Sequence, residues 1–376
     1  MNFLLVLGRE PNLSLAELEA IFSSKCVKPL GKQLAIVNAD HIPLNRLGGT
    51  IKAACIIDGS VQDYLFNLPI GKITLGISDY SPHANPRKTW ELALKYKNLL
   101  KRHGRNVRLL PNNNSAVLSS ATAHHNQLGE KLNHIELIKY GEYIASSIGA
   151  QNITSYAKRD QARPARDAFV GMLPPKLAQI IINLATTGAK TGVVLDPFCG
   201  TGVTLQEASL MNYSAYGTDL SEKMIQYSQK NLDWIAKQSS DTQKQSISAL
   251  RLETGDATSH QWQNPIDFVA SETYLGHPLS SIPPEVKFRE LQSEAKNLLT
   301  AFLKNIGKQL KPGTQLALAI PAWKRHDGGY QGVNILDETD RLGYNVVKYR
   351  YAHSDNLLYY REGQIVARQI IVLRKK

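Results

Sequence analysis

The residues most able to do chemistry lie in one short loop, residues 196–202, which reads Asp-Pro-Phe-Cys-Gly-Thr-Gly. An apolar run at residues 193–195 precedes the loop, and residues 203–210 follow it with the composition of a helix. Strand, glycine loop and helix in this order open the nucleotide-binding sheets of α/β proteins. Because Gly200 and Gly202 carry no Cβ, a ligand can lie directly on their backbone. The loop is therefore the predicted floor of a cofactor site.

The acidic residues around this loop indicate which ligand it holds. Asp196 ends the first predicted strand, Asp219 ends the second, and Asp256 follows the third. Each acid alone could be an ordinary polar residue, whereas three at successive strand ends favour one shared ligand. Asp196 would repel a phosphate, and Leu205 stands where a dinucleotide fingerprint has its third glycine. A P-loop is excluded because no Gly-Lys-Ser/Thr follows.

S-adenosylmethionine meets these conditions, because it carries an ammonium and a sulfonium and no phosphate. We expect Asp196 to attract its amino group, Asp219 to accept from its ribose hydroxyls, and Asp256 to accept from its adenine amine. No metal site is predicted, since the cysteines and histidines lack ligand spacing. The predicted cofactor-binding residues are Asp196, Phe198, Cys199, Gly200, Thr201, Gly202, Asp219, Leu220, Asp256 and Ala257.

A parallel sheet with helices between its strands would bring these residues to one edge. Strands are predicted at residues 193–196, 215–220, 250–254, 267–270, 315–320, 345–351 and 366–373. Helices are predicted at residues 176–185, 203–210, 288–310 and 333–342, with a further helix from Glu222. The last two strands have only a loop between them and are expected to pair antiparallel. The predicted fold class of this half is α/β and Rossmann-like.

The beginning of the chain predicts a smaller α+β sheet. Strands are expected at residues 3–8, 33–38, 51–57 and 73–78. Helices are expected at residues 14–24, 43–47 and 61–65. Ser14 and Glu17 have the spacing of a capping box at the start of the first helix. The order is typical of a ferredoxin-like sheet, and without a catalytic cluster its role is expected to be structural or positional.

Basic residues gather at residues 87–108, where Glu91 is the only acid. Trp90, Leu94, Leu99 and Leu100 give this stretch an apolar face, which predicts a basic amphipathic helix. Strands are expected after it, at residues 106–110 and 117–122. Such a helix can simply be solvated, but the chain's formal net charge of +12 favours contact with nucleic-acid phosphates. The predicted RNA-binding residues are Arg87, Lys88, Lys95, Lys101, Arg102, Arg105 and Arg108.

The 376-residue chain is long enough for two or three domains. Residues 156–168 are charged and show no periodicity, which predicts a linker with a domain boundary near residue 160. Cys26, Cys55 and Cys199 cannot all pair, which indicates reduced thiols and a cytoplasmic protein. No stretch of the sequence approaches a membrane span, so no membrane partner is expected.

Several segments resemble a known family. Residues 196–202 resemble motif I of the class I methyltransferases that modify exocyclic amines of nucleic-acid bases. Residues 7–18, 117–121, 163–167 and 171–178 are similar to segments of the THUMP-containing tRNA guanine-N2 methyltransferases, which include the archaeal enzymes for guanine 10. The resemblance covers nearly the whole chain. It implies a ferredoxin-like domain at 1–70, a THUMP RNA-binding domain at 71–158 and an S-adenosylmethionine-dependent methyltransferase domain at 159–376.

The main departure from this family follows the fourth predicted strand. The family has an Asp-Pro-Pro-Tyr type motif there, whereas residues 271–274 read Ser-Glu-Thr-Tyr. The resemblance implies that Glu272 accepts a hydrogen bond from the target amine and that Tyr274 stacks on the base. It further implies methylation of the N2 amine of a tRNA guanosine, with position 10 expected. The enzyme would be a monomer, with a small activator subunit as a possible partner.

Two alternatives stay open. A DNA amino-methyltransferase would share the catalytic fold, although the amino-terminal half is more similar to an RNA-binding region. A catalytically degenerate RNA-binding scaffold would account for the missing prolines, although the cofactor acids are all present. An NAD-linked oxidoreductase is disfavoured by the glycine spacing and by Asp196.

Overall fold

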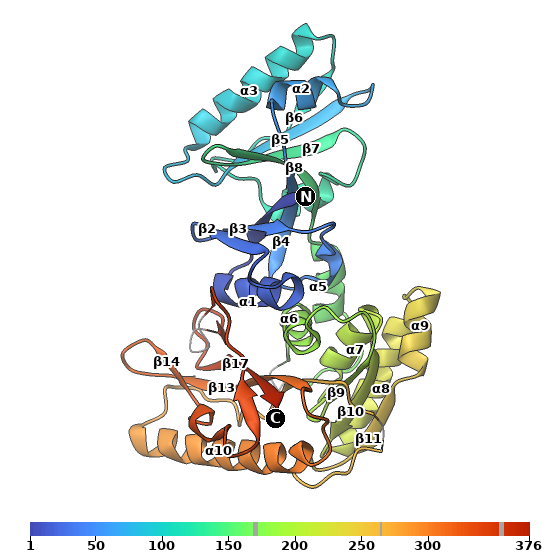
Figure 1. Cartoon of the computed structure of the whole chain (residues 1–376), viewed down its shortest axis with the longest axis vertical. Helices are drawn as coiled ribbons and strands as arrows, with labels where there is room; N and C mark the ends of the chain where they lie inside the picture. The colour runs from blue at the N-terminus through green and yellow to red at the C-terminus, as the bar shows by residue number, and fades with distance from the viewer. Residues whose placement is uncertain (168–171, 264, 353–356) are drawn as a thin grey trace. The chain divides into compact units, whose positions relative to one another are not determined.

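The computed structural model describes residues 1–167, 172–263, 265–352 and 357–376 (Figure 1). Two compact units make up the chain. Unit 1 consists of Met1–Leu15 and Phe22–Tyr156, and unit 2 of Ala16–Ile21 and Ala157–Lys376. Ala168, at the end of the predicted linker, and Gly171, in one of the family segments, lie outside the described residues. Among the described helices, none is both long and apolar enough to cross a bilayer.

One eight-stranded sheet forms the body of unit 1. Its strands are, in sheet order, β2 (Val27–Leu30), β3 (Leu34–Asn38), β1 (Asn2–Leu7), β4 (Thr50–Ile56), β8 (Tyr143–Ala150), β7 (His134–Tyr140), β5 (Ile73–Asp79) and β6 (Val107–Leu109). Strands β2, β7 and β8 were absent from the predicted elements. Because β8 pairs with β4, the expected boundary between residues 70 and 71 falls inside a single sheet.

Helix α1 (Pro11–Phe22) starts earlier than predicted. The other helices with bounds in or across unit 1 are η1 (Leu44–Arg46), α2 (Val61–Phe66), α3 (Pro86–Arg102), α4 (Ser120–His125) and α5 (Ile153–Gln161). The predicted capping box is wrong, because Pro11 starts α1 one turn earlier. Ser14 therefore lies inside the helix, where its hydroxyl donates to the carbonyls of Glu10 and Gly49.

Two further expectations fail because polar side chains cap helices that the periodicity did not indicate. The strand predicted at 117–122 is instead a loop that leads into the start of α4, where Ser119 Oγ accepts from the backbone N–H of Thr122. The predicted linker begins as helix α5, where Asn152 Oδ1 accepts from the N–H of Ser155. Short polar side chains of this kind open helices without any apolar pattern.

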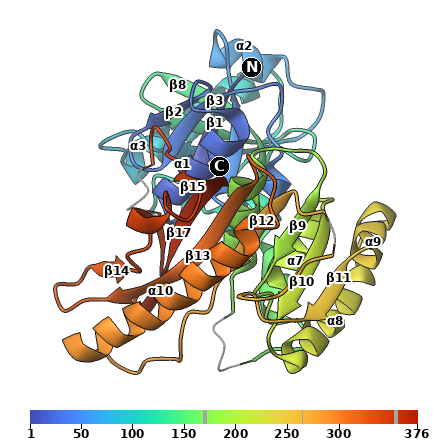
Figure 2. The ribbon, with the colours of Figure 1, turned by 60° about the horizontal axis from the view of Figure 1, so that its bottom comes forward.

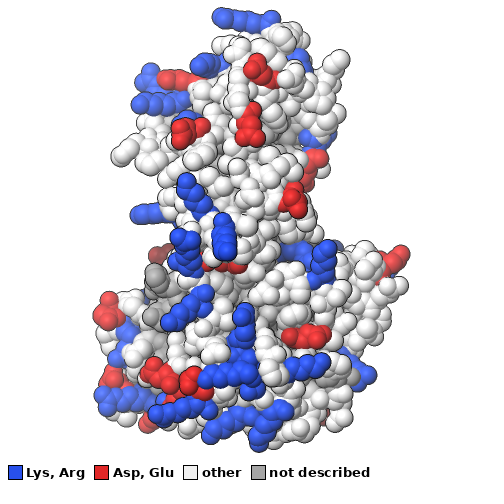
Figure 3. Space-filling model, viewed as in Figure 1, with Lys and Arg blue, Asp and Glu red and all other residues white. Residues whose placement is uncertain are grey.

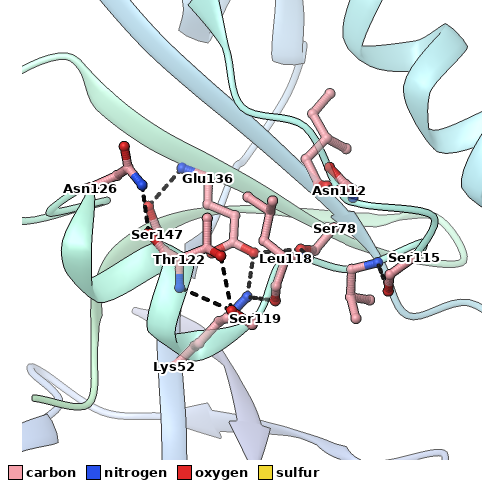
Figure 4. A network of polar contacts seen from close by, with 12 residues as sticks. Lys52, Ser78, Asn112, Ser115, Leu118, Ser119, Thr122, Asn126, Glu136 and Ser147 are labelled. Atoms are coloured by element: carbon pink, nitrogen blue, oxygen red, sulfur yellow. Dashed lines mark hydrogen bonds and ion pairs between the residues drawn. The ribbon is translucent and has the colours of Figure 1, made fainter. Parts of the chain in front are cut away.

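A buried polar network fixes the segment before α4 (Figure 4). Lys52 on β4 reaches Glu136 on β7, with 2.5 Å between Nζ and Oε1. Lys52 Nζ also donates to the carbonyl of Leu118 at 2.6 Å, and Ser78 Oγ donates to Glu136 Oε1 at 2.5 Å. The backbone N–H of Leu118 in turn donates to Ser78 Oγ. This loop is therefore held from inside the unit by charged groups.

The sheet of unit 2 contains the predicted parallel strands. Its order is β11 (Arg251–Thr254), β10 (Ser214–Asp219), β9 (Val193–Asp196), β12 (Phe268–Glu272), β13 (Gln315–Lys324), β17 (Val366–Lys375) and β15 (Tyr344–Val346). The first five are parallel, whereas β17 is antiparallel to β13 and to β15. Short strands β14 (Tyr330–Gly332) and β16 (Leu358–Tyr359) pair with β13 and β17. The predicted α/β class and the antiparallel end of the sheet are confirmed.

Helices cover this sheet along its length (Figure 2). They are α6 (Pro175–Thr186), α7 (Val203–Leu210), α8 (Glu222–Ala236), α9 (Asp241–Ser248) and α10 (Glu285–Gly307). Helix α6 packs on β12 and β13, and α10 buries Phe302, Leu303 and Ile306 in one core with apolar residues of β13. These contacts fix the strand ends that carry the predicted site.

The helix predicted at residues 333–342 is absent. The segment contains one 3₁₀ turn, η2 (Leu336–Glu338), before a β15 that is shorter than predicted. Asn334, Asp337 and Asp340 have low intrinsic helix propensity, which disfavours a helix over this segment. Val333 and Ile335 are buried in the core, and this accounts for the apolar spacing that suggested a helix.

Candidate active site at the ends of the parallel strands

The glycine loop leaves an open backbone surface at the end of β9. Gly200 has φ 52° and Gly202 has φ 83°, values in the left-handed region that favour glycine. A Cβ on Gly202 would stand 2.8 Å from Ser228 Oγ, whereas one on Gly200 would meet nothing within 4 Å. The loop is thus packed from below at Gly202 and open at Gly200. This shape fits a cofactor that lies on the backbone.

Asp219 holds the loop against the neighbouring strand. Its Oδ2 accepts from the N–H of Gly200 at 2.9 Å, and its Oδ1 accepts from the N–H of Ser221 at 2.9 Å. Ser228 Oγ donates to the carbonyl of Gly200 at 2.8 Å. A carboxylate oxygen has two lone pairs, so both oxygens retain capacity for a ribose hydroxyl. The expected role and the loop contacts are therefore compatible.

Asp196 lies beneath the loop and is only 1% exposed. Its Oδ1 accepts from Ser271 Oγ at 2.5 Å and from the N–H of Phe198 at 3.2 Å. Burial raises the pKa of Asp196 to about 7, and nearby Asp219 adds to the rise. Asp196 therefore carries a negative charge beneath the loop when it ionises, and its contact with the amino group of the cofactor stays a prediction.

The other predicted cofactor residues occupy different environments. Phe198 packs edge-on against Phe302, with ring centroids 5.2 Å apart. Cys199 is buried, and burial raises the pKa of its thiol, so it is a packing residue rather than a nucleophile. Thr201 and Ala257 are buried, whereas Leu220 and Asp256 are exposed. Asp256 Oδ1 accepts from the backbone N–H and the hydroxyl of Thr258.

Glu272, the predicted amine acceptor, has a partner that the sequence did not reveal. Arg368 on β17 donates from Nε to Glu272 Oε1 at 2.5 Å. Burial raises the pKa of Glu272, and the Arg368 guanidinium opposes that rise. Ser271, the preceding residue, was also missed, although it bonds Asp196. In the sequence, the indication for Ser271 is the polar run that follows a predicted buried strand. No local sequence pattern indicates a role for Arg368.

Tyr274, the predicted stacking residue, is 53% exposed. Its ring lies perpendicular to that of His277, with 6.1 Å between the centroids. Both side chains follow the end of β12, so they lie on the same segment as Glu272. Among the described residues, no group of three His, Cys, Asp or Glu side chains could hold a metal ion.

The predicted RNA-binding residues fall into two groups. Arg87, Lys88, Lys95, Lys101 and Arg102 are exposed on α3, and Arg108 is exposed on β6. Figure 3 shows Lys and Arg side chains over the surface that α3 occupies. Arg105 is different, because its guanidinium donates to the carbonyls of Leu68, Pro69 and Gly71. This structural contact removes Arg105 from the candidate set.

The apolar face predicted for α3 is partly wrong. Ala93 and Leu100 are buried against β5 and β6, but Trp90 and Leu94 are each 38% exposed. The helix turns by 100° per residue, so Trp90 and Leu94 lie about 40° apart, at the edge of the face that buries Ala93 and Leu100. An aromatic ring on a basic helix suits a nucleic-acid surface better than a core position.

Comparison with known protein families assigns a class to unit 2. Residues 189–336 match a family model described as a methyltransferase domain, and residues 78–230 match one described as DNA methylase. The parallel sheet, the open glycine loop and the first of these matches identify a class I methyltransferase domain. S-adenosylmethionine is the cofactor of such a domain, and the residues at the loop fit it.

Two proteins of similar sequence share less than 30% identity with this chain over the matched residues. The chain is 28% identical over 165 residues to the tRNA (guanine(10)-N2)-dimethyltransferase of Methanothermobacter thermautotrophicus, covering 43% of each chain. It is 26% identical over 193 residues to the protein of the same name from Pyrococcus abyssi, covering 50% of this chain and 48% of the relative. The match therefore spans less than half the length of either relative. The match to a solved class I methyltransferase structure from Listeria monocytogenes has 16% sequence identity and a TM-score of 0.37. It covers 59% of this chain and 66% of the Listeria chain.

Proposed function

We propose that this chain is an S-adenosylmethionine-dependent methyltransferase acting on the exocyclic N2 amine of a guanosine in tRNA, with position 10 as the expected site. The observation that carries the proposal is Glu272, a buried carboxylate at the end of β12 and beside the strand that leads into the cofactor loop. An amine nucleophile needs an acceptor of this kind. The names of the two archaeal relatives support tRNA as the substrate.

Each part of the chain has a task in this proposal. We assign residues 1–70 to the ferredoxin-like part and residues 71–158 to the THUMP part, although both contribute strands to the single sheet of unit 1, and the basic side chains of α3 contact tRNA phosphates. Residues 159–376 carry out the transfer. The chain acts as a monomer, with a small activator subunit as a further partner.

Chemistry at the site is mainly positioning. The bound cofactor supplies a methyl group on its sulfonium, so that a new N–C bond forms at the amine as the C–S bond breaks and a proton leaves the nitrogen. Glu272 accepts a hydrogen bond from the amine and takes up that proton. Tyr274 offers an exposed ring to the guanine once it has left its stack. Orientation of amine and methyl in line accounts for most of the acceleration.

The decisive experiment incubates the purified chain with methyl-labelled S-adenosylmethionine and unmodified tRNA, then maps the product by mass spectrometry. We expect label on the N2 amine of one guanosine. A parallel reaction with duplex and single-stranded DNA tests the DNA methyltransferase alternative, which the match to a DNA methylase model favours. Label in DNA alone would replace the proposal, and cofactor binding without label in any nucleic acid would favour the scaffold.

The Glu272→Gln variant tests the assigned role. We expect transfer to fall by about 10²-fold or more, while affinity for the cofactor stays nearly unchanged. Glu294→Gln is the matched control, because Glu294 is exposed on α10. Calorimetry gives the cofactor affinity and single-turnover kinetics gives the rate. Loss of cofactor binding in Glu272→Gln would instead place Glu272 in the cofactor site.

A further inference from the structure

A buried arginine from a distant strand stands beside the proposed amine acceptor. Arg368 lies 96 positions after Glu272 in the sequence, and its Nε donates to Glu272 Oε1 at 2.5 Å. The side chain of Arg368 is 4% exposed and that of Glu272 is 14% exposed. The arginine is therefore enclosed by the protein, whereas the side chain of Glu272 remains partly exposed.

The sheet explains how the two side chains meet. Strand β13 separates β12 from β17, with Ala319 level with Glu272 and Pro321 level with Arg368. Neither Ala319 nor Pro321 has a side-chain donor or acceptor. The long guanidinium side chain can therefore cross β13 and find the carboxylate as its ionic partner.

We infer that Arg368 is a positioning residue for methyl transfer, which fixes one oxygen of Glu272 and keeps the carboxylate anionic so that its other oxygen faces the target amine. The inference rests on the proposed function and deepens it. Among the contacts of the described residues, none engages Glu272 Oε2. A carboxylate can only accept hydrogen bonds, whereas a protonated carboxyl could donate to the amine and occupy the lone pair that must attack.

The electrostatics of the pair agree with this role. Burial raises the pKa of Glu272, and Arg368 is the charged group that lowers it. Other ionisable groups on neighbouring elements are Asp196 on β9 and Lys176 on α6, two elements that contact β12, Tyr359 on β16, which is level with Arg368, and His277 in the segment after β12. Removing one partner of a buried pair leaves the other uncompensated, so Glu272 without Arg368 would bind a proton at higher pH.

The test compares Arg368→Met and Arg368→Lys with the unaltered chain. Arg374→Met is the matched control, because Arg374 lies exposed on the same strand and donates to Gln315. Single-turnover methyl transfer to tRNA is measured as a function of pH. A second readout follows the Glu272 carboxyl by NMR of carboxyl-labelled glutamate, with Glu272→Gln used to assign the signal.

We expect Arg368→Met to lower transfer at neutral pH by roughly 10²-fold and to move the acidic limb of the pH profile to higher pH. The NMR titration of Glu272 should move in the same direction. Arg368→Lys should recover at least about tenfold of the rate and most of the shift, since it restores a cation but not the planar guanidinium. Arg374→Met should behave as the unaltered chain does.

The outcomes separate the two proposals. Equal loss of rate at all pH values in Arg368→Met, with an unmoved Glu272 titration, would show a purely structural role and overturn the inference alone. Failure of the unaltered chain to methylate any nucleic acid would overturn the proposed function, and the inference with it. Circular dichroism and cofactor affinity establish that each variant is folded. If Arg368→Met does not fold, the rate and the Glu272 titration of Arg368→Lys test the inference.

Discussion

Two carboxylates, one in each unit, lie within 2.5 Å of a buried cation, yet their surroundings differ. In unit 1 the side chains of Lys52 and Glu136 are 1% and 0% exposed. In unit 2 those of Arg368 and Glu272 are 4% and 14% exposed. Lys52 and Glu136 have additional bonds to Leu118 and Ser78, whereas Glu272 accepts from Arg368 and lies at a strand end.

This difference distinguishes a structural ion pair from an ion pair that can contact a ligand. The Lys52–Glu136 pair is enclosed and ties two strands to the loop before α4. The Arg368–Glu272 pair is enclosed only on the side of the arginine. A buried pair whose carboxylate keeps an opening can offer that oxygen to a substrate, and a fully enclosed pair cannot.

The largest expected effect comes from breaking the enclosed pair. Lys52→Met leaves Glu136 as a buried charge without a cation, so the free energy of unfolding of unit 1 should fall by about 3–5 kcal/mol. Amide hydrogen exchange in β4, β7 and β8 measures this loss within the intact chain. Lys28→Met is the control, because Lys28 is exposed on β2 and should change the exchange little. Unchanged exchange in Lys52→Met would mean that the pair contributes nothing to stability.

Replacing both partners of each ion pair separates the effect of the pair on stability from its effect on methyl transfer. Lys52→Met combined with Glu136→Leu should regain most of the stability that the single change loses, because no charge is then left buried. Arg368→Met combined with Glu272→Leu should likewise keep unit 2 folded, but methyl transfer should stay at least about 10²-fold down. Exchange protection and single-turnover rates give the two readouts. Recovery of transfer in the second double variant would contradict the role given to Glu272.

The sequence predicted the parts of the candidate site that depend on neighbouring residues. The glycine loop and the acids of β9 and β10 are signalled locally, because strand, turn and acid are consecutive. Arg368 could not be found in this way, since its relation to Glu272 exists only once β13 and β17 pair. An arginine in a largely apolar strand carries no sign of which carboxylate it will meet.

The same reasoning explains where the fold departed from expectation. The single sheet of unit 1 depends on the pairing of β4 with β8, which are far apart in the chain. The strand expected at 117–122 failed because one cap at Ser119 outweighed a short apolar run. By contrast, β9, β12, β13 and β17 of unit 2 were predicted because their apolar runs specify buried strands without further context, whereas the short strands β14 and β16 were not predicted.

The exposed lysines of α3 can be compared with Arg105, whose guanidinium is bonded to backbone carbonyls of the protein. Combined Lys88→Gln, Lys95→Gln and Lys101→Gln changes on α3 should weaken tRNA binding by about tenfold and reduce its salt dependence, because phosphate contacts release counterions. Arg105→Gln should instead lower stability near residues 68–71 and leave the salt dependence unchanged, since its guanidinium binds carbonyls there. Filter binding at several salt concentrations separates the two. If the tRNA binding of the triple variant had the same salt dependence as that of the unaltered chain, α3 would be excluded as the RNA surface.

Asp196 is a third buried carboxylate, and its described partners are hydroxyl and backbone donors rather than a cation. Its pKa of about 7 lies above the ordinary 3.8, so its contribution to stability is complete below about pH 4 and is lost as the pH rises through 7. Asp196→Asn should remove this dependence, which thermal unfolding across the same pH range measures.

Cofactor binding should show the opposite trend, because an ammonium on the loop favours the ionised form of Asp196. Affinity should rise by about fivefold from about pH 6 to about pH 7, as the ionised fraction grows, while an α-amino group stays charged over this range. Titration calorimetry in two buffers of different ionisation enthalpy should detect release of a proton on binding. In Asp196→Asn both the rise and the proton release should vanish. If they persist, another group titrates at the loop, and the negative charge beneath it has no part in holding the cofactor.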